Sequence, residues 1–207
     1  MTNYFDALEN ELTTIGTLSS TDGVNGFFGQ EVLRFHSIAG SLFESINLIK
    51  KASIDERYIT HILARSLLEN YFWLIYLFDD ASKKEERYER LINSFKRDYY
   101  KLMNEPLLMN KNQLEPADPV WLSIPKGLDV NSMLAQITNN HGERLNYLYF
   151  IYRIASFDTH GKNLSNIFQT TFGKAGNFPV LDLNYAFDLI ANEYLVILQD
   201  LRDKKEI

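Results

Sequence analysis

Apolar residues recur every three or four positions along most of this chain, which is the period of an amphipathic α-helix. The pattern predicts helices over residues 3–15, 28–51, 53–78, 82–103, 129–140, from 143 into the 150s, around 164–168 and 182–202. No stretch alternates apolar and polar residues as a strand does, and no internal repeat is present. We therefore predict an all-α fold, a single-domain up-and-down bundle of about seven or eight helices over residues 1–207.

Two connections interrupt this pattern. Residues 19–26 are rich in turn-forming residues and predict a loop. Residues 104–127 contain Pro106, Pro116, Pro119 and Pro125 among Asn, Asp and Gly residues, and predict one long connection with room for a short helix. Connections of this length in compact domains tend to be functional or mobile. We expect a lid or an interface segment, which Trp121 holds against the body of the protein.

The helix predicted over residues 53–78 should be the central one, because its second half is apolar on nearly all sides. Ser53 and Glu56 have the spacing of a capping box at its start. Arg65 and Glu69 lie one helical turn apart in its first half. They either form an internal ion pair that ties the helix to a neighbour, or line a polar site in the bundle.

Composition and charge narrow the possible classes of protein. The chain contains no cysteine, so disulfides, thiolate zinc sites and a cysteine nucleophile are excluded. A formal net charge of -6 argues against bulk electrostatic capture of nucleic acid. The N-terminal residues lack the pattern of a signal peptide. The longest apolar run, residues 71–78, is far shorter than the roughly 20 residues that a membrane helix needs. We expect a cytoplasmic protein that is not embedded in a membrane.

Most readable catalytic and metal-binding motifs are missing. The sequence has no Glu-x-x-His pair, no His-Glu-x-x-His, no EF-hand, no Rossmann fingerprint and no Gly-x-Ser-x-Gly elbow. Residues 172–179 contain two glycines and a lysine but do not match a P-loop. We predict no metal and no other cofactor. His36 lies beside the apolar stripe of residues 28–51, where we expect a hydrogen-bonded core histidine.

The helix predicted over residues 82–103 is the most polar. It carries seven cationic and four anionic residues, a local charge of 7 - 4 = +3 in an acidic protein. Such a run is either a solvated face or a surface that contacts phosphates, with tyrosines 88, 99 and 100 available for base stacking. In the second interpretation, the residues that contact RNA are Lys83, Lys84, Arg87, Arg90 and Arg97.

The stretch from Tyr152 to Gly161 carries polar chemistry at the end of an apolar helix. On an unbroken helix Arg153 and His160 would share a face about 10.5 Å apart, so a common site requires a bend, which we expect between Ser156 and Gly161. An arginine can neutralise a phosphate, and a histidine that titrates near neutrality can move the proton of an RNA 2′-hydroxyl. Alternatively, Arg153 forms a structural ion pair and His160 caps a helix.

Two motifs, Arg65-Ser-Leu-Leu-Glu69 and Tyr152-Arg-Ile-Ala-Ser-Phe-Asp-Thr-His-Gly161, resemble those of an uncharacterised bacterial branch of the HEPN superfamily. The resemblance covers roughly residues 28–202. It implies a HEPN-like bundle with metal-independent endoribonuclease activity, such as that of a toxin or antiviral-defence effector. The implied catalytic residues are Arg153 and His160. The implied supporting residues are Ser156, Asp158, Thr159, Arg65, Glu69 and Tyr152.

The resemblance also implies partners and contains one departure. It implies a homodimer with a composite cleft, an RNA substrate, and an antitoxin or defence-system partner protein. Many ribonuclease members carry Asn, Asp or His directly after the arginine, where this chain has Ile154. Ser156 or Asp158 could substitute for that polar side chain. The alternative is an inactive HEPN-like module that binds a nucleotide or a partner protein.

Overall fold

The course of the backbone is described by a computed structural model for residues 3–49, 54–138, 142–159, 164–174 and 181–207. Within these ranges nine α-helices and three short 3₁₀ helices occur and no strand is present, which confirms the all-α prediction. The chain divides into two compact units, Met1–Tyr71 with Asn140–Ile207, and Phe72–Asn139. The prediction of one domain over residues 1–207 stays a prediction, and each unit is described by itself.

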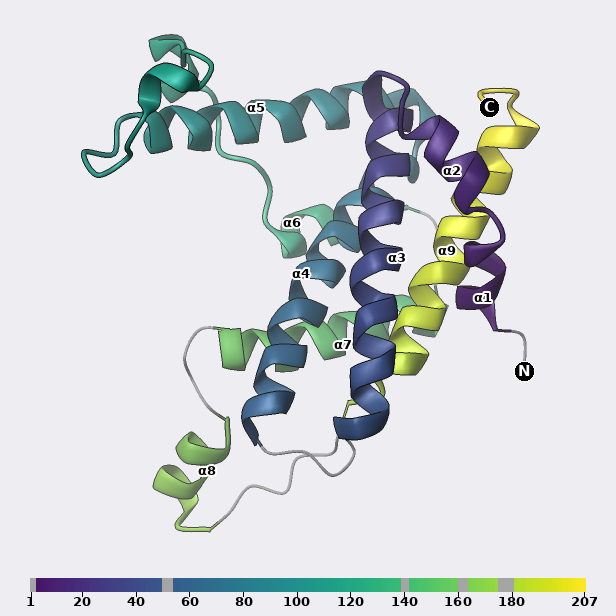
Figure 1. Cartoon of the computed structure of the whole chain (residues 1–207), viewed down its shortest axis with the longest axis vertical. Helices are drawn as coiled ribbons and strands as arrows, with labels where there is room; N and C mark the ends of the chain where they lie inside the picture. The colour runs from purple at the N-terminus through teal and green to yellow at the C-terminus, as the bar shows by residue number, and fades with distance from the viewer. Residues whose placement is uncertain (1–2, 50–53, 139–141, 160–163, 175–180) are drawn as a thin grey trace. The chain divides into compact units, whose positions relative to one another are not determined.

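The larger unit holds the N-terminal helices and the C-terminal helices. Its α-helices are α1 (Tyr4–Glu9), α2 (Leu12–Leu18), α3 (Gly23–Ile49), the first part of α4 (Ile54–Phe78), α7 (Gly142–Thr159), α8 (Leu164–Phe172) and α9 (Leu183–Asp203). Helix α9 packs against α1, α3 and α7, and α2 packs against α3 (Figure 1). The capping carboxylate of Asp182, which accepts a hydrogen bond from the Tyr185 N–H at 3.1 Å, begins α9 where the sequence predicts it.

An aromatic cluster forms the centre of this unit. The Phe35 ring meets Tyr194 edge-on, with ring centroids 5.3 Å apart, and Phe28 meets the same tyrosine at 6.0 Å. Tyr71 of α4 lies 6.1 Å from Tyr194, and all four side chains are almost fully buried. Burial raises the pKa of Tyr71 and of Tyr194 far above the ordinary value, so both phenols stay neutral. The cluster joins α3, α4 and α9 around one apolar core.

Two helix boundaries differ from the prediction. The helix predicted over residues 3–15 is two helices, and the loop predicted over 19–26 is already α3 from Gly23 onward. Two glycines near the start of α3 allow close packing. A Cβ at Gly26 would lie 1.8 Å from the Thr21 carbonyl oxygen, and one at Gly29 would lie 2.6 Å from the Ser19 amide nitrogen. Helix α2 can therefore fold back directly onto α3.

The smaller unit contains the end of α4 and the helices that follow it: η1 (Ala81–Lys83), α5 (Lys84–Met103), η2 (Lys111–Gln113), η3 (Pro119–Ser123) and α6 (Val130–Leu134). Asp129 caps α6 at the predicted start of this helix, by accepting a hydrogen bond from the Ser132 N–H at 2.8 Å. The helix nevertheless ends at Leu134 rather than near residue 140.

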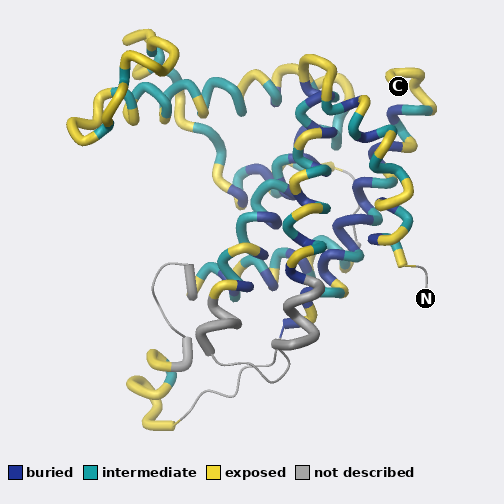
Figure 2. The backbone as a smooth tube through the Cα atoms, in the orientation of Figure 1, coloured by how far each residue is buried: buried dark blue, intermediate teal, exposed yellow. Residues whose placement is uncertain are grey.

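The long connection of residues 104–127 is mostly exposed (Figure 2) and lies along α5 within the same unit. Arg97 Nη1 donates to the Ile124 carbonyl at 2.9 Å, and the Tyr99 hydroxyl donates to the Glu115 carbonyl at 2.7 Å. The Trp121 ring lies 6.4 Å from the Tyr99 ring. Trp121 therefore contacts α5 within the smaller unit, and the lid or interface role of the connection stays a prediction.

Candidate functional site

Arg65 of α4 is the centre of a polar cluster that joins this helix to α7. Its Nε donates to Ser156 Oγ at 3.2 Å, its Nη1 to Glu69 Oε2 at 3.0 Å and its Nη2 to the Tyr152 hydroxyl at 3.3 Å. The guanidinium carbon also lies 5.1 Å from the centre of the Tyr152 ring. The two residues of the first motif and two residues of the second are thus in direct contact. Arg65, Glu69, Tyr152 and Ser156 are called the α4–α7 cluster below.

The environment of the α4–α7 cluster fixes the protonation of its tyrosine. Partial burial, and next the Glu69 carboxylate, raise the pKa of Tyr152, while Arg65 lowers it. The phenol keeps its proton at neutral pH, so it accepts a bond from Arg65 and retains an O–H donor.

Arg65 itself has little freedom to leave this arrangement. Its side chain is 19% exposed, and its three bonds engage all three guanidinium nitrogens. The ion pair with Glu69, whose side chain is 41% exposed, has a modest energy because water screens it. These bonds hold Tyr152 and Ser156 of α7 against α4.

Helix α7 continues without interruption to Thr159, so the bend predicted between Ser156 and Gly161 does not begin at Ser156. Ser156 is not a cap, because its hydroxyl donates to the Tyr152 carbonyl at 2.7 Å, the i-4 bond typical of serine inside a helix. Asp158 and Thr159 are helical, but their side chains lie outside the described residues. The candidate base His160 also lies outside them.

Arg153 lies on the face of α7 that points to solvent. Leu148, Ile151 and Ala155 are fully buried on the other side of this helix. Arg153 is exposed, and it makes no hydrogen bond or ion pair with any residue that the structure describes. Structural ion pairing, the alternative interpretation of Arg153, therefore has no support within the described chain.

Two phenylalanines share this exposed face with Arg153, and sequence reasoning missed both. Phe150 is 47% exposed and Phe157 is 43% exposed. They precede and follow Arg153 by three and four residues, and at about 100° per residue all three side chains fall within about 60° of arc. Ile154, the departure from the family pattern, is half-buried beside them.

Three cations of η1 and α5 form local ion pairs. Lys83 Nζ lies 2.9 Å from Asp80, Arg90 Nη2 lies 2.5 Å from Glu86, and Lys101 Nζ lies 2.9 Å from Asp98. Lys84 lies over the Phe78 ring, with its nitrogen 5.5 Å from the ring centre. This pairing favours the interpretation of α5 as a solvated face.

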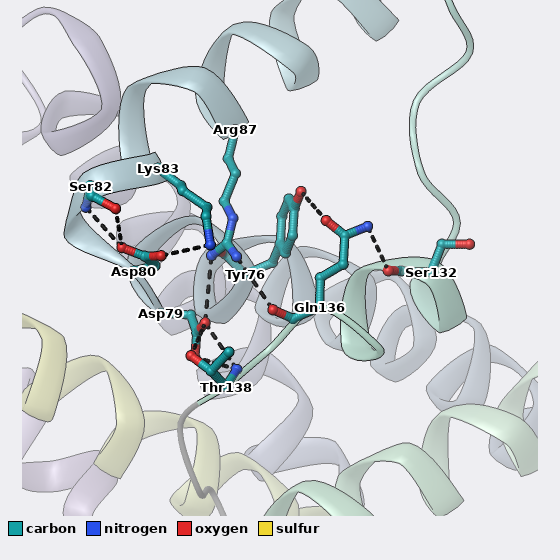
Figure 3. A network of polar contacts seen from close by, with 9 residues as sticks. All are labelled: Tyr76, Asp79, Asp80, Ser82, Lys83, Arg87, Ser132, Gln136 and Thr138. Atoms are coloured by element: carbon teal, nitrogen blue, oxygen red, sulfur yellow. Dashed lines mark hydrogen bonds and ion pairs between the residues drawn. The ribbon is translucent and has the colours of Figure 1, made fainter.

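Arg87 is buried and cannot contact RNA in this conformation, which corrects its assignment as an RNA-contacting residue. Its side chain is 3% exposed, and its guanidinium donates to the carbonyls of Tyr76 and Gln136. The guanidinium carbon lies 4.2 Å from the centre of the Tyr76 ring (Figure 3). The sequence suggests a surface cation at this position, because the other residues of α5 are mostly polar. Only the fold shows which residues cover the Arg87 side chain.

The negative partner of Arg87 is Asp79, whose side chain is inaccessible to solvent. Their charged atoms lie 3.7 Å apart, and the Asp79 carboxylate also accepts from the N–H and hydroxyl of Thr138 (Figure 3). Next to it, hydrogen bonds from Ser82 and then from Lys83 hold the pKa of Asp80 well below its ordinary value. These contacts fasten the end of α4, the start of α5 and the segment after α6 to one another. Their role is structural.

The remaining candidates do not form a site. His36 stacks on Phe5 with ring centroids 4.8 Å apart, but its Nε2 has no hydrogen-bond partner among the described residues, contrary to expectation. In the ranges that the structure describes, no three His, Asp or Glu side chains come together as a possible metal site. Among the described helices, none combines the length and apolar content that a membrane crossing requires.

Comparison with known proteins gives no match to a family model, to a curated protein or to a solved structure.

Proposed function

We propose that this protein is a HEPN-type, metal-independent endoribonuclease, acting as a toxin or an antiviral-defence effector. The observation that carries the proposal is the direct contact between the two motif segments, Arg65 and Glu69 on α4 with Tyr152 and Ser156 on α7. Residues far apart in the sequence form one polar cluster. Two of them, Tyr152 and Ser156, belong to the same motif as Arg153 and His160. This arrangement supports a role for both motifs in one site.

The proposed reaction needs only groups that the chain supplies. His160 takes the proton of an RNA 2′-hydroxyl, and the 2′-oxygen attacks the adjacent phosphorus. Arg153 neutralises the charge that develops on the phosphate oxygens. The bond from phosphorus to the 5′-oxygen breaks and the leaving oxygen takes a proton from water, which leaves a 2′,3′-cyclic phosphate and a 5′-hydroxyl.

We further propose that each site combines Arg153 of one copy with His160 of a second copy. Helix α7 is unbroken from Arg153 to Thr159. The six residues from 153 to 159 advance the chain by about 9 Å along the helix axis. A composite cleft in a homodimer brings the two groups together without requiring the chain to turn back on itself. Sites formed between copies of a symmetric dimer occur in pairs.

The test is cleavage of RNA in the presence of EDTA by the wild-type protein and by Arg153→Ala and His160→Ala variants. Each variant alone should fold and lose cleavage. Subunits mixed in equal amounts and allowed to exchange should recover about a quarter of wild-type activity, because half of the dimers are hybrids and each hybrid has one intact site. Unchanged cleavage by His160→Ala would contradict the ribonuclease assignment. If the single variants stay active and mixing adds no activity, the result contradicts both the composite site and a site within one copy.

The mixing experiment also separates the composite site from a site within one copy. If both single variants are inactive and exchange restores nothing, although hybrids form, then Arg153 and His160 act within one protomer. If the wild-type protein cleaves no RNA at all, the second candidate function applies, a non-catalytic HEPN-like module that binds a nucleotide or a partner protein. Ile154 directly after Arg153 is the observation that favours this second candidate.

A further inference from the structure

We propose that the exposed face of α7 formed by Phe150, Arg153 and Phe157 holds single-stranded RNA, with bases stacked on the two phenyl rings and a phosphate on the guanidinium. This inference rests on the proposed function and names the form of its substrate. The three residues are called the α7 face below.

The cation at the centre of the α7 face is available for a phosphate. Every other arginine whose side chain the structure describes makes a hydrogen bond or an ion pair: residues 34, 65, 87, 90, 97, 144 and 202. Arg153 makes none with a described residue. An unpaired guanidinium on an exposed helix presents its full set of donors to an anion.

The rings on either side of Arg153 are suited to bases. Phe150 and Phe157 are nearly half exposed although α7 has a fully buried face of its own, so burial within this chain does not account for them. Stacking of bases on aromatic side chains is tolerant of sequence, since every base offers a flat π surface. Together with one cation between them, two such rings form a short binding surface for a strand with accessible bases.

The distance between the rings selects single-stranded RNA. Seven residues of helix separate the two phenylalanines by about 10.5 Å along the axis, about three times the 3.4 Å spacing of stacked bases in one strand. Bases on both rings cannot be neighbours in a continuous stack, so the strand must be splayed open. A duplex keeps its base faces covered and offers only backbone and groove contacts.

The charge of the protein makes stacking the larger contribution. The chain carries a formal net charge of -6, and the α7 face contributes one cation. For single strands, the slope of log K against log salt is about -0.7 for each phosphate neutralised. Binding at the α7 face should therefore show a slope near -0.7 per site, whereas binding along the basic helix α5 would show a slope several times steeper.

The test measures binding without cleavage, in a His160→Ala background. The probe is a short fluorescein-labelled oligouridylate, and its anisotropy gives the dissociation constant. Phe150→Ala and Phe157→Ala should each weaken binding by about tenfold, and the same strand in a duplex should bind much more weakly. Phe95→Ala, which removes a 66% exposed phenylalanine from α5, is the matched control and should leave binding unchanged.

Several results would overturn the proposal. They are equal binding by the Phe150→Ala/Phe157→Ala double variant, equal binding of single strand and duplex, or weakening by Phe95→Ala alone. A change of oligomeric state in the double variant, measured by light scattering, would instead identify the α7 face as a contact between copies. Failure of the ribonuclease proposal gives a different result, namely no cleavage by the wild-type protein while the binding differences remain.

Discussion

Arg87 and Arg90 lie three residues apart on α5, but their surroundings are opposite. Arg90 is 51% exposed and pairs with Glu86 in water, whereas Arg87 is 3% exposed and faces the inaccessible Asp79 carboxylate. Removing one partner of a buried pair leaves an uncompensated charge, which costs far more than the loss of a surface pair.

We predict that Arg87→Met lowers the free energy of unfolding by about 3–5 kcal/mol, because Asp79 would remain buried without its cation. The matched Arg90→Met variant should lower it by less than about 0.5 kcal/mol. Urea unfolding followed by circular dichroism measures both. Equal effects of the two substitutions would show that Arg87 is solvated in solution.

The same contrast shows why single residues were only partly predictable. Arg65 and Glu69 form an i, i+4 pair wherever this segment is helical. Both alternatives stated for them, an ion pair and the lining of a polar site, describe part of the observed cluster. The burial of Arg87 depends on Asp79 and Gln136, which the sequence gives no reason to place beside it. Phe150 and Phe157 belong to an apolar stretch without a clear polar side, so the exposed face could not be identified before the buried one was known.

At the scale of helices, the caps were predictable and the close approaches were not. Asp129 and Asp182 begin α6 and α9 where the sequence places them, because an N-cap is a local interaction. The early start of α3 was missed, because Gly26 is used for contact with Thr21 and not for a turn. A glycine does not reveal by itself which of these two uses applies.

Two glycines of the α2–α3 pair should therefore respond in opposite directions to replacement by alanine. Gly29→Ala should destabilise the protein by about 1–3 kcal/mol, since the added Cβ would lie 2.6 Å from the Ser19 backbone. Gly16→Ala, in the interior of α2 with nothing within 4 Å of the added Cβ, should stabilise it by about 0.5–1 kcal/mol. Thermal and urea unfolding of both variants decide the matter. A stable Gly29→Ala protein would mean that α2 does not pack on α3 at this distance.

For the molecule as a whole, the sequence correctly predicts an all-α fold, because the apolar period extends over nearly the whole chain. The division into two compact units was not predicted. It falls within α4, between Tyr71 and Phe72, where the apolar pattern continues unbroken. Hydrophobic periodicity identifies a helix but does not indicate which neighbours cover it along its length.

The smaller unit exposes large apolar side chains on the connection that follows α5. Leu107 is 91% exposed and Met109 is 80% exposed. Side chains that are as exposed in the folded state as in the unfolded state contribute little to folding, so Leu107→Ser/Met109→Ser should change the free energy of unfolding by less than about 0.5 kcal/mol. The same change should raise solubility in ammonium sulfate, because it removes exposed apolar surface. Urea unfolding at low and high protein concentration provides the control: a loss of stability that appears only at high concentration would show that a second copy covers these residues.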